Sequence, residues 1–132
     1  MDKFKLEFVT PEKQIMSDDV EQVILPGSEG EFTILANHSP IISSLRPGFI
    51  KIFNGDNDNS FDYFVTEGFV DMTSSELTIL AQESIERSDL DSIKINAFIE
   101  SYQNQIDETN DEEKKNKYNI KIEHLKVIQA SL

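Results

Sequence analysis

The chain has 132 residues, with 12 Lys and Arg against 25 Asp and Glu, so its formal net charge is -13. It contains no Cys, which excludes disulfides, thiolate metal sites and cysteine nucleophiles. The negative excess repels phosphate backbones and anionic lipids, and no apolar run approaches the roughly 18 residues of a spanning helix. We therefore expect no nucleic-acid partner and no direct membrane insertion.

The first part of the chain predicts short β-strands. In the run 4–8, apolar residues alternate with Lys5 and Glu7, the pattern of a strand with one face toward a core. Further runs rich in β-branched and aromatic residues lie at 20–25, 32–35, 49–53, 61–65, 69–72 and 77–81. Turn-forming sequences separate them at 26–27, 47–48, 54–55 and 73–75. No helical segment is available between these runs for a parallel crossover, so residues 1–86 predict an antiparallel β-sandwich or barrel.

From residue 87 the hydrophobic period changes to about 3.6, the period of a helix. The sequence 88–91 (SDLD) has the form of a capping box and predicts a helix to about residue 106, and 109–112 (TNDE) repeats the pattern before a second helix to about residue 130. Each helix carries one apolar stripe: Ile95, Phe98 or Ile99, Tyr102 and Ile106 on the first, and Tyr118, Ile122, Leu125 and Ile128 or Gln129 on the second. Residues 87–132 therefore predict an antiparallel two-helix hairpin, and the fold class is α+β.

Charge is unevenly divided between these two parts. Residues 1–86 hold 5 basic and 16 acidic side chains, whereas 87–132 hold 7 and 9, which gives -11 and -2. In the second helix, Lys114, Lys117 and Lys121 follow at i, i+3 and i+7 and form a basic stripe. Such a stripe is either a solvated face or a docking surface for an acidic partner.

Residues that could support catalysis or bind metal are few. His38 and His124 are the two histidines, and they lie in different predicted units without metal-ligand spacing. Ser39 beside His38 makes no triad, because adjacent residues of an extended segment point to opposite faces. The sequence 27–30 (GSEG) precedes a strand and predicts a turn, not a phosphate loop. The sequence 56–60 (DNDNS) imitates a calcium loop but lacks its Gly and its final Glu. We expect no catalytic and no metal residue.

One motif carries a family resemblance. The segments 25–40 (LPGSEGEFTILANHSP) and 45–48 (LRPG) strongly resemble the epsilon subunit of F-type rotary ATP synthases. Shorter matches at 8–12, 64–70, 80–82, 90–91 and 124–128 extend the resemblance over the whole chain. Thr33 and Ala36 stand where the family usually has Gly and Pro.

The resemblance implies a noncatalytic central-stalk subunit, peripheral on the cytoplasmic side of a bacterial inner membrane. Its sandwich would contact the gamma subunit and the c-ring, and its hairpin would reach the alpha-beta hexamer and inhibit ATP hydrolysis. Glu31 corresponds to the family position near the c-ring. His38 corresponds to the neighbouring turn, which would face either gamma or the c-ring, and the lysine stripe would face an acidic loop of the hexamer. These are the expected partner contacts: Glu31, His38, Lys114, Lys117 and Lys121.

Some relatives bind ATP at the start of the hairpin through a motif whose positions here include Asp91 and Lys94. Lys94 replaces an Arg and Ile95 replaces an Ala, so the planar bidentate fork is lost and we expect no cofactor. Two other classes are open from the residues alone. A free-standing ligand-binding β-sandwich would need exposed aromatics, yet the chain has no Trp and three Tyr, and a small acid-base hydrolase would need a convergent base and nucleophile.

Overall fold

The computed structural model describes residues 2–55 and 60–132, and the chain folds as two compact units, Met1–Arg87 and Ser88–Leu132. Residues 56–59 of the calcium-like run at 56–60 lie outside the described residues, and Ser60 begins β7. The strands of the first unit are β1 (Phe4–Val9), β2 (Gln14–Val20), β3 (Gln22–Gly27), β4 (Gly30–Leu35), β5 (Ile41–Leu45), β6 (Gly48–Phe53), β7 (Ser60–Val65), β8 (Gly68–Met72), β9 (Glu76–Ala81) and β10 (Ser84–Glu86). The helices of the second are α1 (Ser92–Glu108) and α2 (Glu112–Ala130). This confirms the predicted α+β class.

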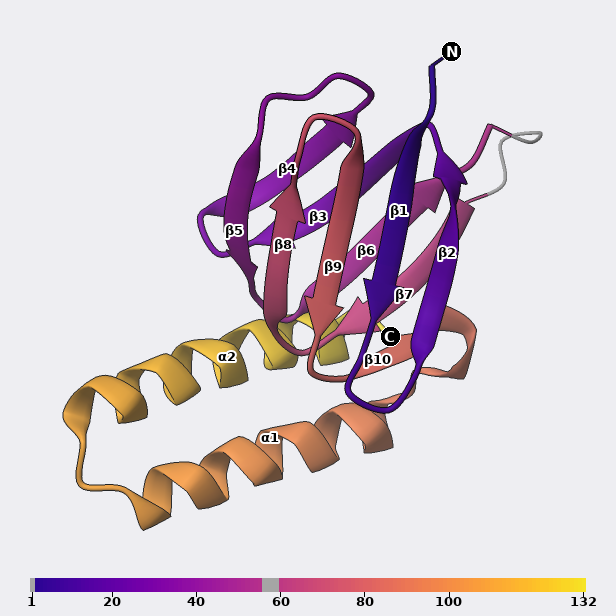
Figure 1. The fold of residues 1–132 in the computed structure, drawn as a ribbon. Coiled ribbons are helices and arrows are strands. Elements are labelled where there is room, and N and C mark those ends of the chain that lie inside the picture. The colour runs from indigo at the N-terminus through magenta and orange to yellow at the C-terminus, as the bar shows by residue number, and fades with distance from the viewer. Residues whose placement is uncertain (1, 56–59) are drawn as a thin grey trace. The chain divides into compact units, whose positions relative to one another are not determined.

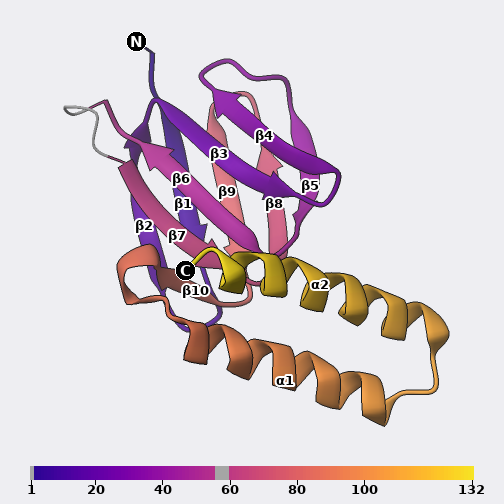
Figure 2. The same cartoon turned by 180° about the vertical axis from the view of Figure 1, so that it is seen from behind.

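The strands form one ten-stranded sheet that is folded into two layers (Figure 1). One layer has the order β5-β8-β9-β1-β2 and is nearer the viewer in Figure 1. The other contains β4, β3, β6, β7 and β10 and is nearer the viewer in Figure 2. Only the pair Gly27 and Leu45 joins β3 to β5, so the sheet turns the corner there.

The expectation of a purely antiparallel sheet is wrong at one place, because β1 pairs with β9 in parallel. Leu6 lies opposite Leu77 and Phe8 opposite Ile79 in this pair. A parallel neighbour needs a long connection, and here seven intervening strands supply it instead of a crossover helix. The pair therefore links the first strand of the unit to one of the last.

Alternation along the strands builds the core between the two layers. In β1 the predicted inward residues Phe4, Leu6 and Phe8 are all buried, while Lys5 and Glu7 lie on the outer face. In the other layer, the inward residues of β3 and β6 complete the core. The core is Phe4, Leu6, Phe8, Val20, Val23, Leu25, Ile34, Leu45, Ile50, Ile52, Val65, Val70, Met72, Leu77, Ile79 and Ala81. Burial of this kind stabilises by roughly 25 cal/mol for each Å² of apolar surface removed from water.

Three strands were missed by the sequence pattern, and one predicted run is divided. The run at 20–25 belongs to two strands, because Glu21 separates β2 from β3. The edge strand β2 lacks a clear alternation, since it ends in Ser17, Asp18 and Asp19 before Val20. Two serines in β5 and the three-residue length of β10 hide those strands in the same way.

Both helices are capped by aspartates that differ from the predicted capping boxes. Ser88 does not cap α1, because residues Arg87–Asp89 form a 3-10 turn and Asp91 is the N-cap, accepting from the Lys94 amide at 2.8 Å. Asp111, not Thr109, caps α2 and accepts from the amides of Glu113 and Lys114. Asp is as effective as Ser at this position. Each helix therefore has a good N-cap residue, but it lies two or three residues after the predicted one.

The predicted stripes meet as expected between the two helices, which run antiparallel (Figure 1). The Tyr102 and Tyr118 rings stack with centroids 5.8 Å apart, and the Lys121 ammonium lies 5.5 Å from the Tyr102 centroid. Near the other end of the hairpin, the Gln129 side chain donates to the Ser92 carbonyl at 3.0 Å. Ile95, Tyr102, Ile122 and Leu125 are buried. Side-chain contacts at both ends therefore hold the hairpin closed.

Candidate partner-binding surfaces

An apolar patch lies on the outer face of the β5-β8-β9 layer. Ile42, Phe69 and Leu80 are 77%, 61% and 50% exposed, although each is a large hydrophobic side chain. Phe69 lies directly opposite Leu80 across β8 and β9, and Ile42 lies opposite the next outward residue of β8. We call these three residues the apolar patch. Contiguous exposed apolar residues of this kind mark a surface that another molecule covers.

The patch could have been inferred from pairs of consecutive apolar residues. The sequences Ile41-Ile42, Phe69-Val70 and Ile79-Leu80 each place one apolar side chain inward and the other outward, because strand residues alternate between faces. A strand with both faces apolar is covered on both sides. No residue of the patch is among the partner contacts predicted from the sequence.

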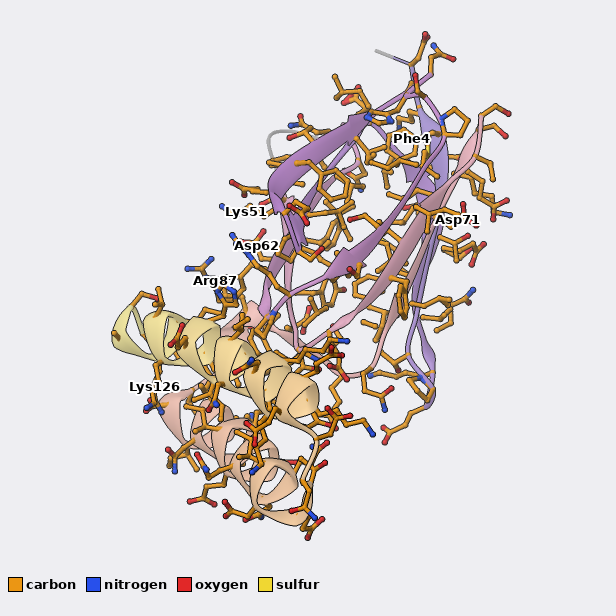
Figure 3. All side chains as sticks on the ribbon, turned by 90° about the vertical axis from the view of Figure 1, so that its left-hand side faces the viewer. Phe4, Lys51, Asp62, Asp71, Arg87 and Lys126 are labelled. Atoms are coloured by element: carbon orange, nitrogen blue, oxygen red, sulfur yellow. The ribbon has the colours of Figure 1, made fainter. Side chains whose placement is uncertain are left out.

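Two carboxylates, Glu7 and Asp71, share the outer face with the patch. Glu7 is held by its neighbours: Ser17 donates at 2.6 Å, Gln14 donates at 2.8 Å, and the Lys5 ammonium lies 3.5 Å away. The hydrogen bond from Ser17 is the main reason why the pKa of Glu7 lies below its ordinary value. Figure 3 shows Asp71 on the side of the sandwich away from Lys51, Asp62 and Arg87.

Two of the predicted partner contacts, Glu31 and His38, lie on and after β4. Glu31 is an exposed residue of β4, paired with Pro26 of β3. Asn37 has a left-handed backbone with φ of 65°, so the chain turns sharply before His38. The Nδ1 atom of His38 lies 2.6 Å from the Ser39 carbonyl oxygen, so this ring nitrogen contacts the backbone and not the Ser39 hydroxyl. Glu31 is thus exposed and His38 half-buried, on adjoining segments.

The sequence 27–30 is a tight hairpin turn, as predicted. Gly27 pairs with Gly30 across it, and Ser28 and Glu29 form the two-residue loop. A Cβ atom at Gly27 would lie 2.7 Å from both the Gly30 carbonyl oxygen and the Phe32 ring. Gly30 has φ of 132°, which L side chains rarely adopt. The two glycines are thus required by the turn that places Glu31 at the start of β4.

The lysine stripe of α2 is not uniform. Lys114 and Lys117 are exposed, whereas Lys121 is half-buried with its ammonium over the Tyr102 ring. Lys115, beside the stripe, lies 3.8 Å from Glu112. In the closed hairpin, Lys114 and Lys117 therefore point to solvent, while Lys121 contributes to packing.

The positions of the nucleotide motif make local contacts. The Asp91 carboxylate caps α1, and the Lys94 ammonium donates to the Asp89 carbonyl at 2.6 Å. Both side chains serve the start of the helix. The structure therefore does not direct them toward a common ligand.

Arg87 ends the first unit with its side chain fixed to the sandwich. Its guanidinium lies 4.3 Å from the centre of the Phe49 ring and 3.9 Å from Asp62 (Figure 3). Phe49 in turn meets Phe64 edge to face, with centroids 6.0 Å apart. A cation over an aromatic ring contributes about 0.5–1 kcal/mol at an exposed site. These contacts fix the last residue before the hairpin segment.

Residues 2–55 and 60–132 contain no group of three or more His, Asp or Glu side chains that could hold a metal ion. Over the same residues, no helix is both long enough and apolar enough to cross a membrane. Among the described residues, the apolar patch with its acidic surroundings and the exposed lysines of α2 are surface features that a partner could recognise.

The sandwich belongs to a known class of domain. Residues 3–87 match the family model described as "ATP synthase, Delta/Epsilon chain, beta-sandwich domain". This range covers all ten strands and ends at Arg87. The first unit is therefore a β-sandwich of the delta/epsilon class.

Full-length relatives extend the assignment to the hairpin. The ATP synthase epsilon chain of Maricaulis maris is 33% identical over 129 residues, which cover 98% of this chain and 96% of the relative. That of Brucella anthropi is 34% identical over 131 residues, covering 98% and 95%. The chain belongs to the ATP synthase epsilon chain family and is a noncatalytic subunit. Family membership excludes the small hydrolase and the free-standing ligand-binding module.

Solved structures agree on the fold. A chain in the structure of the Euglena gracilis mitochondrial ATP synthase, described as OSCP/F1/c-ring, has a TM-score of 0.73 at 19% identity and covers 98% of this chain. That match covers 81% of the Euglena chain. A chain in the Tetrahymena thermophila central stalk and c-ring structure has a TM-score of 0.59 at 20% identity, covering 67% and 69%. At such low identity the likeness concerns the fold alone.

Proposed function

We propose that this chain is the epsilon subunit of the central stalk of a rotary, proton-driven ATP synthase, and that its apolar patch docks on the gamma subunit. The observation that carries the docking proposal is the exposure of Ile42, Phe69 and Leu80 on one sheet face. Burying a side chain of this size stabilises by roughly 1.5–3 kcal/mol, so three together can anchor a subunit. Rotation of the c-ring would then reach the catalytic hexamer through gamma with this chain attached.

A second contact of the sandwich is proposed with the c-ring. Glu31 is exposed and His38 is half-buried, and Glu31 directly follows the tight turn at 27–30, where the two glycines are sterically required. Polar side chains that follow a turn of defined backbone geometry suit a contact with a polar partner surface. The distant structural neighbours come from assemblies whose descriptions include a c-ring.

The hairpin is proposed to inhibit ATP hydrolysis by contacting the alpha-beta hexamer. Lys114 and Lys117 are exposed and carry positive charge that an acidic loop would attract. Lys121 would join them only after it leaves the Tyr102 ring. Exposed ion pairs contribute about 0.2–1 kcal/mol each, so a stripe of three can shift a hairpin between two conformations without locking either.

The location that suits this function is the cytoplasmic side of a bacterial inner membrane, with the chain held there by its partners. The relatives from Maricaulis maris and Brucella anthropi are bacterial. Gamma, the c-ring and the alpha-beta hexamer would supply every contact to the membrane sector and the catalytic sites.

The test is ATP hydrolysis by the purified parent complex, reconstituted with the full chain or with a chain ending at residue 87. A several-fold higher rate with the shortened chain is expected if the hairpin inhibits. A triple replacement of Lys114, Lys117 and Lys121 by Gln should give part of that rise. Equal rates with all three chains would limit the function to coupling and assembly through the sandwich.

A second measurement tests the docking surface. The variant Phe69→Ser removes the largest side chain of the apolar patch while leaving a residue that strands tolerate on an outer face. It should lower the affinity of the full chain for a parent complex depleted of this subunit. Unchanged affinity, with an unchanged melting curve of the variant, would contradict docking through this face.

A further inference from the structure

The outer face around the apolar patch is ordered in two adjacent rows across the strands. One row is Ser44, Phe69, Leu80 and Val9, in the order β5, β8, β9, β1. The next row is Ile42, Asp71, Thr78 and Glu7 in the same order. Directly opposed residues in neighbouring strands have Cβ atoms about 4.5–5.5 Å apart. Asp71 therefore lies beside Ile42 and diagonally beside Leu80, inside the area that a partner on the apolar patch must cover.

The two carboxylates of the second row differ in their partners. Glu7 accepts hydrogen bonds from Ser17 and Gln14 and lies near the Lys5 ammonium. The Asp71 side chain makes no hydrogen bond and no ion pair within the described parts of the chain, and it is exposed. Water satisfies it while the face is free. If a partner covers this face, the charge of Glu7 stays compensated by its own neighbours in the chain. The charge of Asp71 does not, because its side chain has no such neighbour.

When a partner covers the apolar patch, the Asp71 carboxylate loses its contact with water. A carboxylate taken out of water without a partner is strongly disfavoured, and a partner cation with good geometry offsets that loss. Neighbouring Ile42 offers no hydrogen-bond donor, and the only side-chain donor beside Asp71 in its row is the hydroxyl of Thr78. The compensating charge must therefore come from the docked molecule.

We infer that the subunit docked on the apolar patch presents a basic side chain, Arg or Lys, to Asp71. The inference rests on the proposed docking through this face and adds the chemistry of the partner: an apolar contact over Phe69 and Leu80 with a cation one row away. The net charge of -11 on residues 1–86 favours such a partner and steers it toward the sandwich. Asp71 fixes the register of the docked surface, because a shift by one row would place the cation on Phe69.

The experiment measures the affinity of the full chain for the parent complex depleted of this subunit, at several salt concentrations. Asp71→Asn should weaken binding at least about tenfold and reduce its salt dependence, and Asp71→Lys should weaken it about a hundredfold. The matched control is Asp18→Asn, which removes the same charge from β2, at a position paired with inward-facing Leu6, and keeps the oxygen that accepts from the Asp19 amide. It should bind like the unaltered chain.

The outcomes separate this inference from the docking proposal. If Phe69→Ser weakens binding but Asp71→Asn binds with unchanged affinity and salt dependence, docking stands and the inferred cation is wrong. If neither variant weakens binding, both are wrong. If replacing one gamma Arg or Lys by Glu restores the binding of Asp71→Lys, the pair is identified directly.

Discussion

The sandwich and the hairpin differ in what holds each of them together. The sandwich has a continuous core to which nine of its ten strands contribute, and Arg87 extends its contacts to the last residue of the unit. In the described hairpin, buried side chains occur only at Leu90, Ile95, Tyr102, Ile122 and Leu125. A segment with few buried contacts opens at low free energy, whereas a continuous core does not. We therefore expect the hairpin to open more readily than the sandwich.

Charge follows the same division. The sandwich carries -11, and the hairpin carries -2 with lysines gathered on α2. An acidic sandwich and a helix with exposed lysines suit different partners. The proposed functions of the two units, docking and inhibition, thus correspond to differences in both stability and charge.

The largest expected effect is on the sandwich. Phe8 is fully buried and meets Tyr63 edge to face at 5.4 Å, so Phe8→Ala should lower the free energy of unfolding by about 3–5 kcal/mol. The chain has no Trp, so tyrosine fluorescence can follow urea unfolding. With Tyr102 and Tyr118 changed to Phe, Tyr63 reports the sandwich alone. A loss below about 1 kcal/mol would contradict a tightly packed core at Phe8.

The next effect should be confined to the hairpin. Tyr102→Ala removes the stack on Tyr118 and the ring under Lys121, which together contribute about 1–2.5 kcal/mol. Amide hydrogen exchange should become faster throughout α1 and α2 and stay unchanged in β1 and β9. Tyr102→Phe keeps the ring and is the control. Equal acceleration in the strands would show that the two units unfold together and would contradict the lower stability expected of the hairpin.

Much of this fold follows from hydrophobic periodicity, and its failures have physical causes. In the run 4–8 apolar and charged residues alternate strictly because one face of β1 packs on the core, whereas in 48–53 burial alternates although Phe49 and Phe53 on the outer face are also apolar. In β2 and β5 hydrogen bonding to neighbours, not the side chains, makes the strand, so serines and aspartates are tolerated. The parallel pairing of β1 with β9 was missed because it depends on the path of the whole chain.

The functional surfaces were predictable only in part. The motif at 25–48 led to Glu31 and His38, and helix periodicity led to the lysines of α2. The apolar patch was missed because Ile42, Phe69 and Leu80 are far apart in sequence and meet only through strand pairing. The packing of Lys121 against the Tyr102 ring was missed for a related reason, since Tyr102 belongs to the other helix.

A smaller effect is expected at the start of α2. Asp111 accepts from the amides of Glu113 and Lys114, so Asp111→Ala should cost about 0.5–2 kcal/mol of helix stability. Asp111→Asn keeps an accepting oxygen and should lose less. Far-UV circular dichroism on heating measures both. Because only the hairpin is affected, the fluorescence transition of Tyr63 should not move, and a shift of that transition would argue that the sandwich depends on the hairpin.

The smallest effect concerns the pH dependence of the sandwich. Burial, with the nearby charges of Glu12 and Glu67, raises the pKa of Glu83 above its ordinary value. The folded state then holds the Glu83 proton more tightly than the unfolded state, so this carboxyl favours folding at low pH and the advantage is lost as pH rises through the raised pKa. Glu83→Gln should therefore stabilise the chain near neutral pH, by no more than about 0.5 kcal/mol for a solvent-screened site. Glu29→Gln, in the exposed turn between β3 and β4, removes the same charge as a control. Unfolding free energies across the acid range should differ between the two variants, with the gain of Glu83→Gln growing as pH rises; a gain that grew toward acid pH would contradict the sign of the shift.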